Sequence, residues 1–141
     1  MGKKKKIVPD TDTFHFSNLN PKGRSTGDCV VRAFAAFLNL SWEQVYTELA
    51  QFGLEHATAM NCPETYVKFL LSKGWEKEPM PRRSDRTKYT GREFCKELAK
   101  PGYVYILAMA GHLTFVGADS RIWDTWDCGE KSVGNVWSRS L

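Results

Sequence analysis

The order of helix and strand signals along this 141-residue chain predicts one α+β domain. Helical spacing and N-terminal capping sequences recur from residue 28 to about residue 100, and strand-like runs dominate from residue 103 onward. A hairpin signal at residues 111–124 indicates that the later part is an antiparallel sheet. The expected architecture is therefore a set of N-terminal helices packed on a C-terminal antiparallel β-sheet.

Charge and composition narrow the class of protein further. We expect a disordered basic tail over residues 1–12 and a single folded domain over residues 13–141. Lys3 to Lys6 supply four positive charges and the formal net charge is +4, so the rest of the chain is neutral. A neutral body argues against a nucleic-acid-binding surface, and the tail is most simply a solvated end.

The length of the apolar runs and the number of cysteines indicate the cellular compartment in which the protein is expected. No apolar run approaches the roughly 18 residues of a membrane span, and no apolar stretch follows the N-terminal lysines as in a signal peptide. These features predict a cytoplasmic protein without membrane contact. In a reducing compartment we expect four free thiols, those of Cys29, Cys62, Cys95 and Cys128. The chain has no CxxC or HxxxH pair, so we expect no metal site and no cofactor.

The first element expected is a short strand over residues 13–16, where the sequence alternates, at a sheet edge or folded over the site. A loop rich in Asn, Pro and Gly follows over residues 17–27. A helix is then predicted over residues 28–38, because apolar side chains fall at i, i+3, i+4 and i+7 from Val30.

Two further helices are expected before residue 75. A capping box at Ser41–Gln44 opens a helix that should end near residue 52. Gly53 then marks a loop that continues to residue 60. The next helix has Asn61 as its N-cap and ends before Gly74.

The remaining segments complete the sheet. A short strand is expected over residues 75–78 and a long polar surface loop over residues 79–89. A second capping box at Thr90–Glu93 opens a helix that runs to about residue 100. The apolar run 103–109 is predicted to be a central strand, and residues 135–137 a strand that closes the sheet.

The register of the hairpin decides which acid faces His112. With an odd-numbered turn, Asp124 projects from the same face as His112, one diagonal step away. With a two-residue turn at residues 119–120, Asp127 lies opposite His112 instead. The first register is preferred because it gathers three apolar side chains on the other face, those of Leu113, Phe115 and Trp123.

Cys29 falls in the first turn of the predicted helix 28–38, directly after a polar loop. A thiol there is exposed to unpaired backbone N–H groups and to the positive end of the helix dipole, and both favour the thiolate. The thiolate is the nucleophile in cysteine catalysis, so Cys29 is the candidate catalytic residue. The simpler interpretation is a small buried hydrophobic side chain, with Asp28 interacting with the N-terminus of its own helix.

A cysteine at a helix N-terminus, followed by a histidine and an aspartate on adjacent strands, resembles the papain-like cysteine peptidases. The matching motifs are Asp28-Cys29, Gly111-His112 and Trp123-Asp124. The resemblance runs from about Ser25 onward and is strongest for small bacterial and phage-type members such as the double-glycine leader peptidases. It implies a papain-like fold, a protein or peptide substrate, and a Cys29–His112–Asp124 triad that cleaves a peptide or isopeptide bond through an acyl-enzyme. Asp127 is the alternative acid.

One feature of that family is missing from this sequence. Papain-like enzymes commonly place a Gln about six residues before the cysteine to complete the oxyanion hole, and Gly23 holds that position here. The backbone N–H of Cys29 can supply one donor. Asn20 is the preferred candidate for the second donor, with Asn18 and Ser25 as alternatives in the same loop.

Two other functions fit the same residues. Transglutaminase-like and acyltransferase relatives use the same triad but transfer the acyl group to an amine, so an added amine would be incorporated into product. A non-catalytic papain-like domain that binds a partner protein is favoured by the missing Gln. Such a domain would keep its function in the Cys29→Ala variant.

Overall fold

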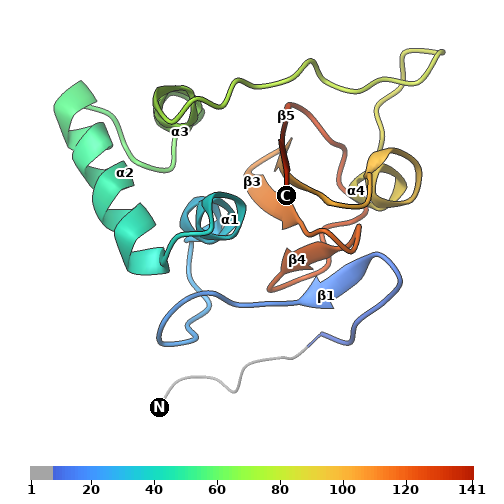
Figure 1. Ribbon diagram of the computed structural model, residues 1–141, viewed down its shortest axis with the longest axis horizontal. Helices are drawn as coiled ribbons and strands as arrows, with labels where there is room; N and C mark the ends of the chain where they lie inside the picture. Colours follow the sequence, from blue (N-terminus) through green and yellow to red (C-terminus); the bar gives the residue numbers. More distant parts are fainter. Residues whose placement is uncertain (1–7) are drawn as a thin grey trace.

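The computed structural model describes residues 8–141, so the lysines of the predicted basic tail lie outside the described residues. The described part has a mixed α+β fold with helices on both faces of one five-stranded sheet (Figure 1). In chain order the elements are β1 (Phe14–Phe16), α1 (Cys29–Leu38), α2 (Trp42–His56), α3 (Pro63–Ser72), α4 (Gly91–Glu93), the π-helix η1 (Phe94–Leu98), β2 (Tyr103–Met109), β3 (His112–Val116), β4 (Ile122–Asp124) and β5 (Val136–Ser140). No helix in residues 8–141 combines the length and apolar composition that crossing a membrane requires.

The strand order in the sheet is β1-β4-β3-β2-β5. β2 pairs antiparallel with β3 and β5, and β3 pairs antiparallel with β4. β1 is an edge strand, as expected, but it pairs parallel to β4 with Phe14 opposite Ile122. The prediction of a wholly antiparallel sheet is therefore wrong at this edge. Parallel strands need a long crossover, and the chain from α1 to β3 supplies it.

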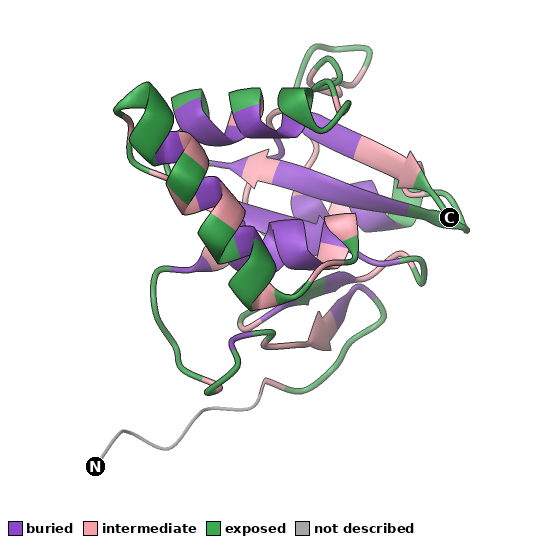
Figure 2. Cartoon of the chain, turned by 60° about the vertical axis from the view of Figure 1, so that its left-hand side comes forward, coloured by how far each residue is buried: buried purple, intermediate pink, exposed green. Residues whose placement is uncertain are grey.

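Alternate residues of the central strand β2 face two separate cores. Ile106 belongs to the core beneath α1, α2 and α3, whereas Leu107 belongs to the core beneath η1. Figure 2 shows buried residues along the strands and along the sheet-facing sides of the helices, with exposed residues on their outer sides. Because both faces of β2 are covered, its sequence is apolar almost throughout, which is why the strand was predictable.

All four cysteines are free thiols, as predicted. Some element boundaries differ from the prediction because contacts outside the local sequence set them. α3 has Cys62 as its N-cap instead of Asn61. Residues 75–78 form no strand, and Glu78 makes only an isolated bridge to Val136. Thr90 forms the predicted capping box, but the helix continues as a π-helix and ends at Leu98.

The predicted disorder of residues 8–12 is also wrong. Asp10 Oδ1 accepts a hydrogen bond of 3.0 Å from the Phe16 backbone N–H, and Asp10 Oδ2 lies 2.7 Å from His15 Nδ1. Arg121 Nη1 lies 3.3 Å from the same Oδ2. These bonds tie the segment before β1 to β1 itself and to the turn before β4, a contact across more than a hundred residues that local sequence does not reveal.

Helix α2 runs through Gly53 to His56, so the predicted end near residue 52 is wrong. A Cβ at Gly53 would lie 2.7 Å from the backbone oxygen of Thr58, which is closer than a carbon and an oxygen can approach. Thr58 N–H also donates a hydrogen bond of 2.9 Å to the Gly53 carbonyl. Gly53 therefore lacks a side chain because the backbone of Thr58 packs closely against it, and it does not end the helix.

We expect Gly53→Ala to destabilise the protein although alanine is the better helix former. Helix propensity alone would add about 1 kcal/mol of stability, but overpacking against a backbone atom costs about 1–3 kcal/mol. We expect a net loss of up to about 2 kcal/mol in urea unfolding. The exposed Gln51→Ala on the same helix is the control and should stay within about 0.5 kcal/mol. A gain in stability for Gly53→Ala would contradict the close-approach explanation.

Candidate active site

Cys29 is the first residue of α1, where backbone N–H groups have no partner within the helix. Its side chain is half-buried. Asp28 is the N-cap residue, but its side chain makes no capping hydrogen bond, so the interpretation that it serves the N-terminus of its own helix is wrong. No side chain cap therefore competes with a thiolate at Cys29 for the positive end of the helix.

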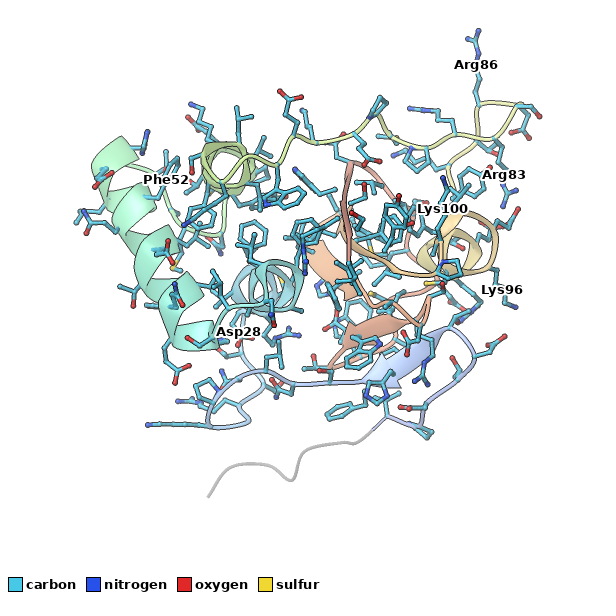
Figure 3. The ribbon with its side chains drawn as sticks, viewed as in Figure 1. Asp28, Phe52, Arg83, Arg86, Lys96 and Lys100 are labelled. Atoms are coloured by element: carbon cyan, nitrogen blue, oxygen red, sulfur yellow. The ribbon has the colours of Figure 1, made fainter. Side chains whose placement is uncertain are left out.

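Asp28 is buried and its carboxylate holds three elements together. Oδ1 accepts a hydrogen bond of 2.8 Å from Arg32 Nε. Oδ2 accepts bonds of 3.0 Å from Asn20 Nδ2 and from Trp42 Nε1. Figure 3 shows Asp28 beside α1, on the side of α2. Burial raises the pKa of Asp28, but the hydrogen bonds from Arg32, Asn20 and Trp42 lower it by more than burial raises it. The resulting pKa lies below the usual value of 3.8.

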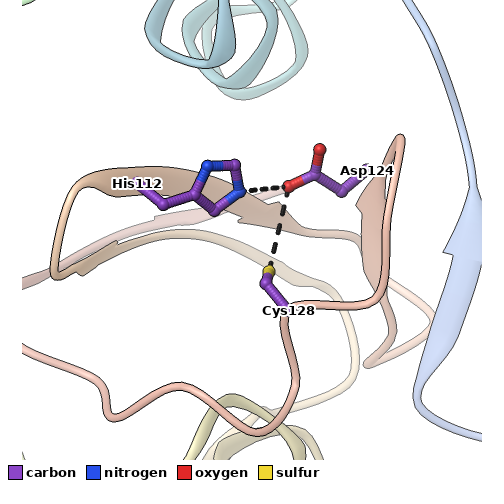
Figure 4. A group of neighbouring side chains, drawn as sticks. All are labelled: His112, Asp124 and Cys128. Atoms are coloured by element: carbon purple, nitrogen blue, oxygen red, sulfur yellow. Dashed lines mark hydrogen bonds and ion pairs between the residues drawn. The ribbon is translucent and has the colours of Figure 1, made fainter.

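His112 begins β3 and Asp124 ends β4. Val116 pairs with Ile122 across the turn, so the odd-numbered register is confirmed. His112 Nε2 lies 2.7 Å from Asp124 Oδ2 (Figure 4). Asp127, the alternative acid, instead accepts at Oδ1 a hydrogen bond of 2.9 Å from the Gly129 N–H.

The Asp124 carboxylate is almost fully buried, with 2% of the residue exposed. Thr114 Oγ1 donates a hydrogen bond of 2.6 Å to Oδ2, and Arg32 Nη1 donates one of 2.8 Å to Oδ1. Burial raises the pKa of Asp124, but His112, Thr114 and Arg32 together bring it below 3.8. An ionised carboxylate therefore stands against the histidine ring.

Cys29 and His112 shift each other's protonation. Burial raises the pKa of Cys29, but the His112 ring, the Leu113 backbone and the Arg32 charge bring it below 9.0. Burial lowers the pKa of His112, but Asp124, Cys128 and Cys29 raise it to about 11. Both directions favour a thiolate beside an imidazolium. A thiolate and an imidazolium side by side are the charge states that cysteine catalysis requires.

Of the neighbouring aromatic residues, Trp126 contacts His112, whereas Trp123 and the other two histidines make contacts elsewhere. The Trp126 ring covers His112, with ring centroids 4.9 Å apart. Trp123 instead packs against His15 of β1, with ring centroids 4.3 Å apart and ring planes tilted by 53°. His56 is exposed and bonds to the Phe52 carbonyl on its own helix. His112 is therefore the histidine that the fold brings to Cys29.

The predicted oxyanion donors lie in the loop before α1 but are bound within it. Asn20 Nδ2 donates to Asp28, and Asn18 Nδ2 donates a hydrogen bond of 3.1 Å to the Arg24 carbonyl. Ser25 is exposed. Asn18 and Asn20 therefore act first as supports of the loop that leads to Cys29, and the uncapped backbone N–H groups of α1 are the donors that the fold presents.

Three residues of the site are also potential metal ligands. His112, Asp124 and Cys128 have ligand atoms within 4.8 Å of one another. However, Asp124 Oδ2 already accepts a hydrogen bond from Thr114, and the guanidinium of Arg32 stands against the same carboxylate. A divalent cation would displace these bonds and be repelled by Arg32. We therefore assign the three side chains to the hydrogen-bond network around His112.

Sequence reasoning missed Arg32, Thr114 and Cys128. The Cys128 Sγ lies 3.9 Å from Asp124 Oδ2, and Cys128 helps to raise the pKa of His112. Arg32 is a charged residue four positions after Asp28, on an otherwise apolar helix. An acid and an arginine at i and i+4 form ion pairs on helices, and that spacing was the available signal.

The lowered pKa predicts fast alkylation of Cys29 by iodoacetamide below pH 9.0. We expect labelling at pH 6–7 to fall at least about tenfold in His112→Ala, since one pKa unit changes the thiolate fraction about tenfold. Peptide mass spectrometry measures each cysteine separately. Exposed Cys62 is the reference thiol, and Cys95, whose pKa burial raises to about 12, should stay unlabelled. Equal labelling rates of Cys29 in wild type and His112→Ala would show that His112 does not lower the pKa of Cys29.

Removing Arg32 should cost far more stability than removing a surface arginine. Arg32→Met removes the charged partner of buried Asp28 and one of the two charged partners of buried Asp124, so we expect a loss of about 3–5 kcal/mol in urea unfolding at pH 7. The control Arg121→Met removes exposed ion pairs to Asp119 and Asp10 and should cost less than about 1 kcal/mol. Equal losses would show that the buried pairs do not join α1 to the sheet.

The loss in Arg32→Met should also depend on pH. The pKa values of Asp28 and Asp124 are lowered in the folded protein, so their ionised forms stabilise it above pH 3.8. That stability disappears as the pH falls through the folded-state values. The difference between wild type and Arg32→Met should therefore shrink below pH 3.8.

The site has to be interpreted from its own geometry. Comparison of the chain with models of protein families, with curated proteins and with solved structures finds no match. A functional assignment therefore depends on the contacts among Cys29, His112 and Asp124 and on the elements that hold them.

Proposed function

We propose that this protein is a cysteine peptidase, a thiol hydrolase that cleaves a peptide or isopeptide bond through an acyl-enzyme. One observation carries the proposal: Cys29, at the uncapped start of α1, has its pKa lowered by a histidine that a buried aspartate holds. A cysteine kept only for packing would have a raised pKa, as Cys95 does.

In this proposal each member of the triad has a defined step. The Cys29 thiolate attacks the carbonyl carbon and forms the C–S bond, and the carbonyl electrons move to the oxygen. The imidazolium of His112 then gives its proton to the leaving amine as the C–N bond breaks. Water attacks the resulting thioester, His112 takes a proton from it, and Cys29 leaves as thiolate.

Asp124 serves this sequence by holding the ring. Its bond to His112 Nε2 leaves Nδ1 for the thiol, and its charge stabilises the imidazolium. Thr114 and Arg32 fix the carboxylate in turn, so the triad acid has little rotational freedom. The tetrahedral oxyanion would lie against the backbone N–H groups at the start of α1, which no side chain caps.

The fold is proposed to be papain-like. Three features support it: the cysteine opens a helix, the histidine opens a strand of the following sheet, and the aspartate ends the adjacent strand. The parallel edge strand β1 lies outside this constellation and pairs only with β4.

A non-catalytic binding module is the second candidate, and the loop before α1 is the observation that favours it. The side-chain amides of Asn18 and Asn20 are held by Arg24 and Asp28, and Gly23 stands where a second donor was expected. Loss of one oxyanion donor typically costs about 2.7–4 kcal/mol of transition-state stabilisation. In such a module the Cys–His pair would be structural.

We expect wild type, and not Cys29→Ala, to generate new termini in a peptide library prepared from a bacterial proteome, read by mass spectrometry. Cleavage in His112→Ala should be at least about 100-fold slower, the usual contribution of a general acid–base. Added glycinamide is the test for acyl transfer, because amide adducts would outnumber hydrolysis products in a transferase. If no product depends on Cys29 in either form, the peptidase proposal fails and the binding module is favoured.

A further inference from the structure

A cavity of about 550 Å³ opens between the start of α1 and α2, and the residues that flank Cys29 in the chain help to line it. Thr26, Gly27 and Asp28 line it before the cysteine, and Val30 and Val31 line it afterwards. The Cys29 side chain faces His112 and Leu113 of β3, so a peptide that reaches both the cavity and the thiol has to cross the start of α1. The volume of the cavity falls within the range of about 300–1,000 Å³ that is typical of small-ligand sites.

The wall of the cavity is apolar and its shape is fixed. Trp42 and Tyr46 stack with ring centroids 5.1 Å apart, and the indole N–H of Trp42 is anchored on Asp28. Buried Leu49 and half-buried Met60 complete the wall. A large apolar side chain would find a wall already in place and would displace water from it.

The charge of the cavity is positive. Lys22 and Arg24 stand on its rim, both exposed, and no ion pair within residues 8–141 uses either of them. The single acid of the lining, Asp28, is neutralised by Arg32 and gives both its oxygens to hydrogen bonds. The rim therefore carries two cations and the wall carries none.

We infer that this cavity selects the substrate: a peptide in which a bulky apolar side chain stands next to an acidic residue. The apolar side chain lies against Trp42 and Met60, and the neighbouring carboxylate pairs with Lys22 and Arg24. The inference rests on the proposed function, because it assigns the cavity to the substrate of Cys29. It adds a chemical preference that the triad alone does not supply.

The test measures binding in the Cys29→Ala protein, so that no turnover is required. Fluorescein-labelled hexapeptide pools with amidated C-termini carry Phe-Glu, Phe-Gln, Phe-Lys or Ala-Glu at the centre, in both orders. In fluorescence polarisation we expect the Phe-Glu pool to bind about fivefold tighter than the Phe-Gln pool. The Phe-Lys pool should bind more weakly than either.

Two variants locate that preference. Lys22→Glu with Arg24→Glu should reverse it, so that Phe-Lys binds tighter than Phe-Glu, whereas the matched control Lys68→Glu with Lys77→Glu should keep it. Lys68 and Lys77 are exposed and lie outside the cavity. Ala59→Trp, at an exposed position of the lining, should fill the cavity and remove the preference for Phe-Glu over Ala-Glu.

Equal binding of Phe-Glu and Phe-Gln, or a preference that survives Lys22→Glu with Arg24→Glu, would overturn the inference. Tighter binding of a single-stranded oligonucleotide than of any peptide pool would also overturn it. These outcomes are separate from the chemistry. An inert Cys29 would refute the peptidase and leave the binding preference standing, whereas cleavage without this selectivity would refute only the assignment of the cavity.

Discussion

The buried charge chain Asp28–Arg32–Asp124 is the interaction on which the arrangement of the site depends. Arg32 lies on α1, whereas Asp124 lies at the end of β4, 92 residues away in sequence. Two carboxylates and one guanidinium are taken out of water together, which is tolerable only because every charge has a partner with good geometry. One arginine thus fixes the nucleophile's helix, the loop before it and the acid that holds His112.

The lowered pKa of Cys29 is the balance of opposing effects, and comparison with Cys95 separates them. Burial alone disfavours a thiolate, and at Cys95, where burial dominates, the pKa rises to about 12. Cys29 is also partly buried, but it faces an imidazolium, a backbone N–H and the charge of Arg32. These partners outweigh desolvation, so position in the fold, and not the residue type, decides which thiol has a lowered pKa.

Helix α1 divides the region around the cysteine into two sides with different chemistry. On one side the β3–β4 hairpin supplies the hydrogen-bonded pair His112 and Asp124. On the other side the cavity beside α2 offers a fixed aromatic wall and two cations. Asp28 belongs to both sides, because it bonds to Arg32 toward the hairpin and to Trp42 toward the cavity.

Local periodicity and capping patterns were enough to predict several elements from the residues alone. The apolar pattern of residues 112–116 and 122–124 favoured the register that brings His112 to Asp124 over the one that brings it to Asp127, and Ser41 and Thr90 marked their helix starts. The tertiary structure decided the rest: the parallel edge strand, the passage of α2 through Gly53, and the contacts of Arg32 and Cys128 with Asp124. Each of these depends on groups brought together from distant or irregular segments. The local sequence pattern reveals the periodicity of a helix or strand. It does not reveal which distant residue will contact a given side chain, because that depends on how the whole chain folds.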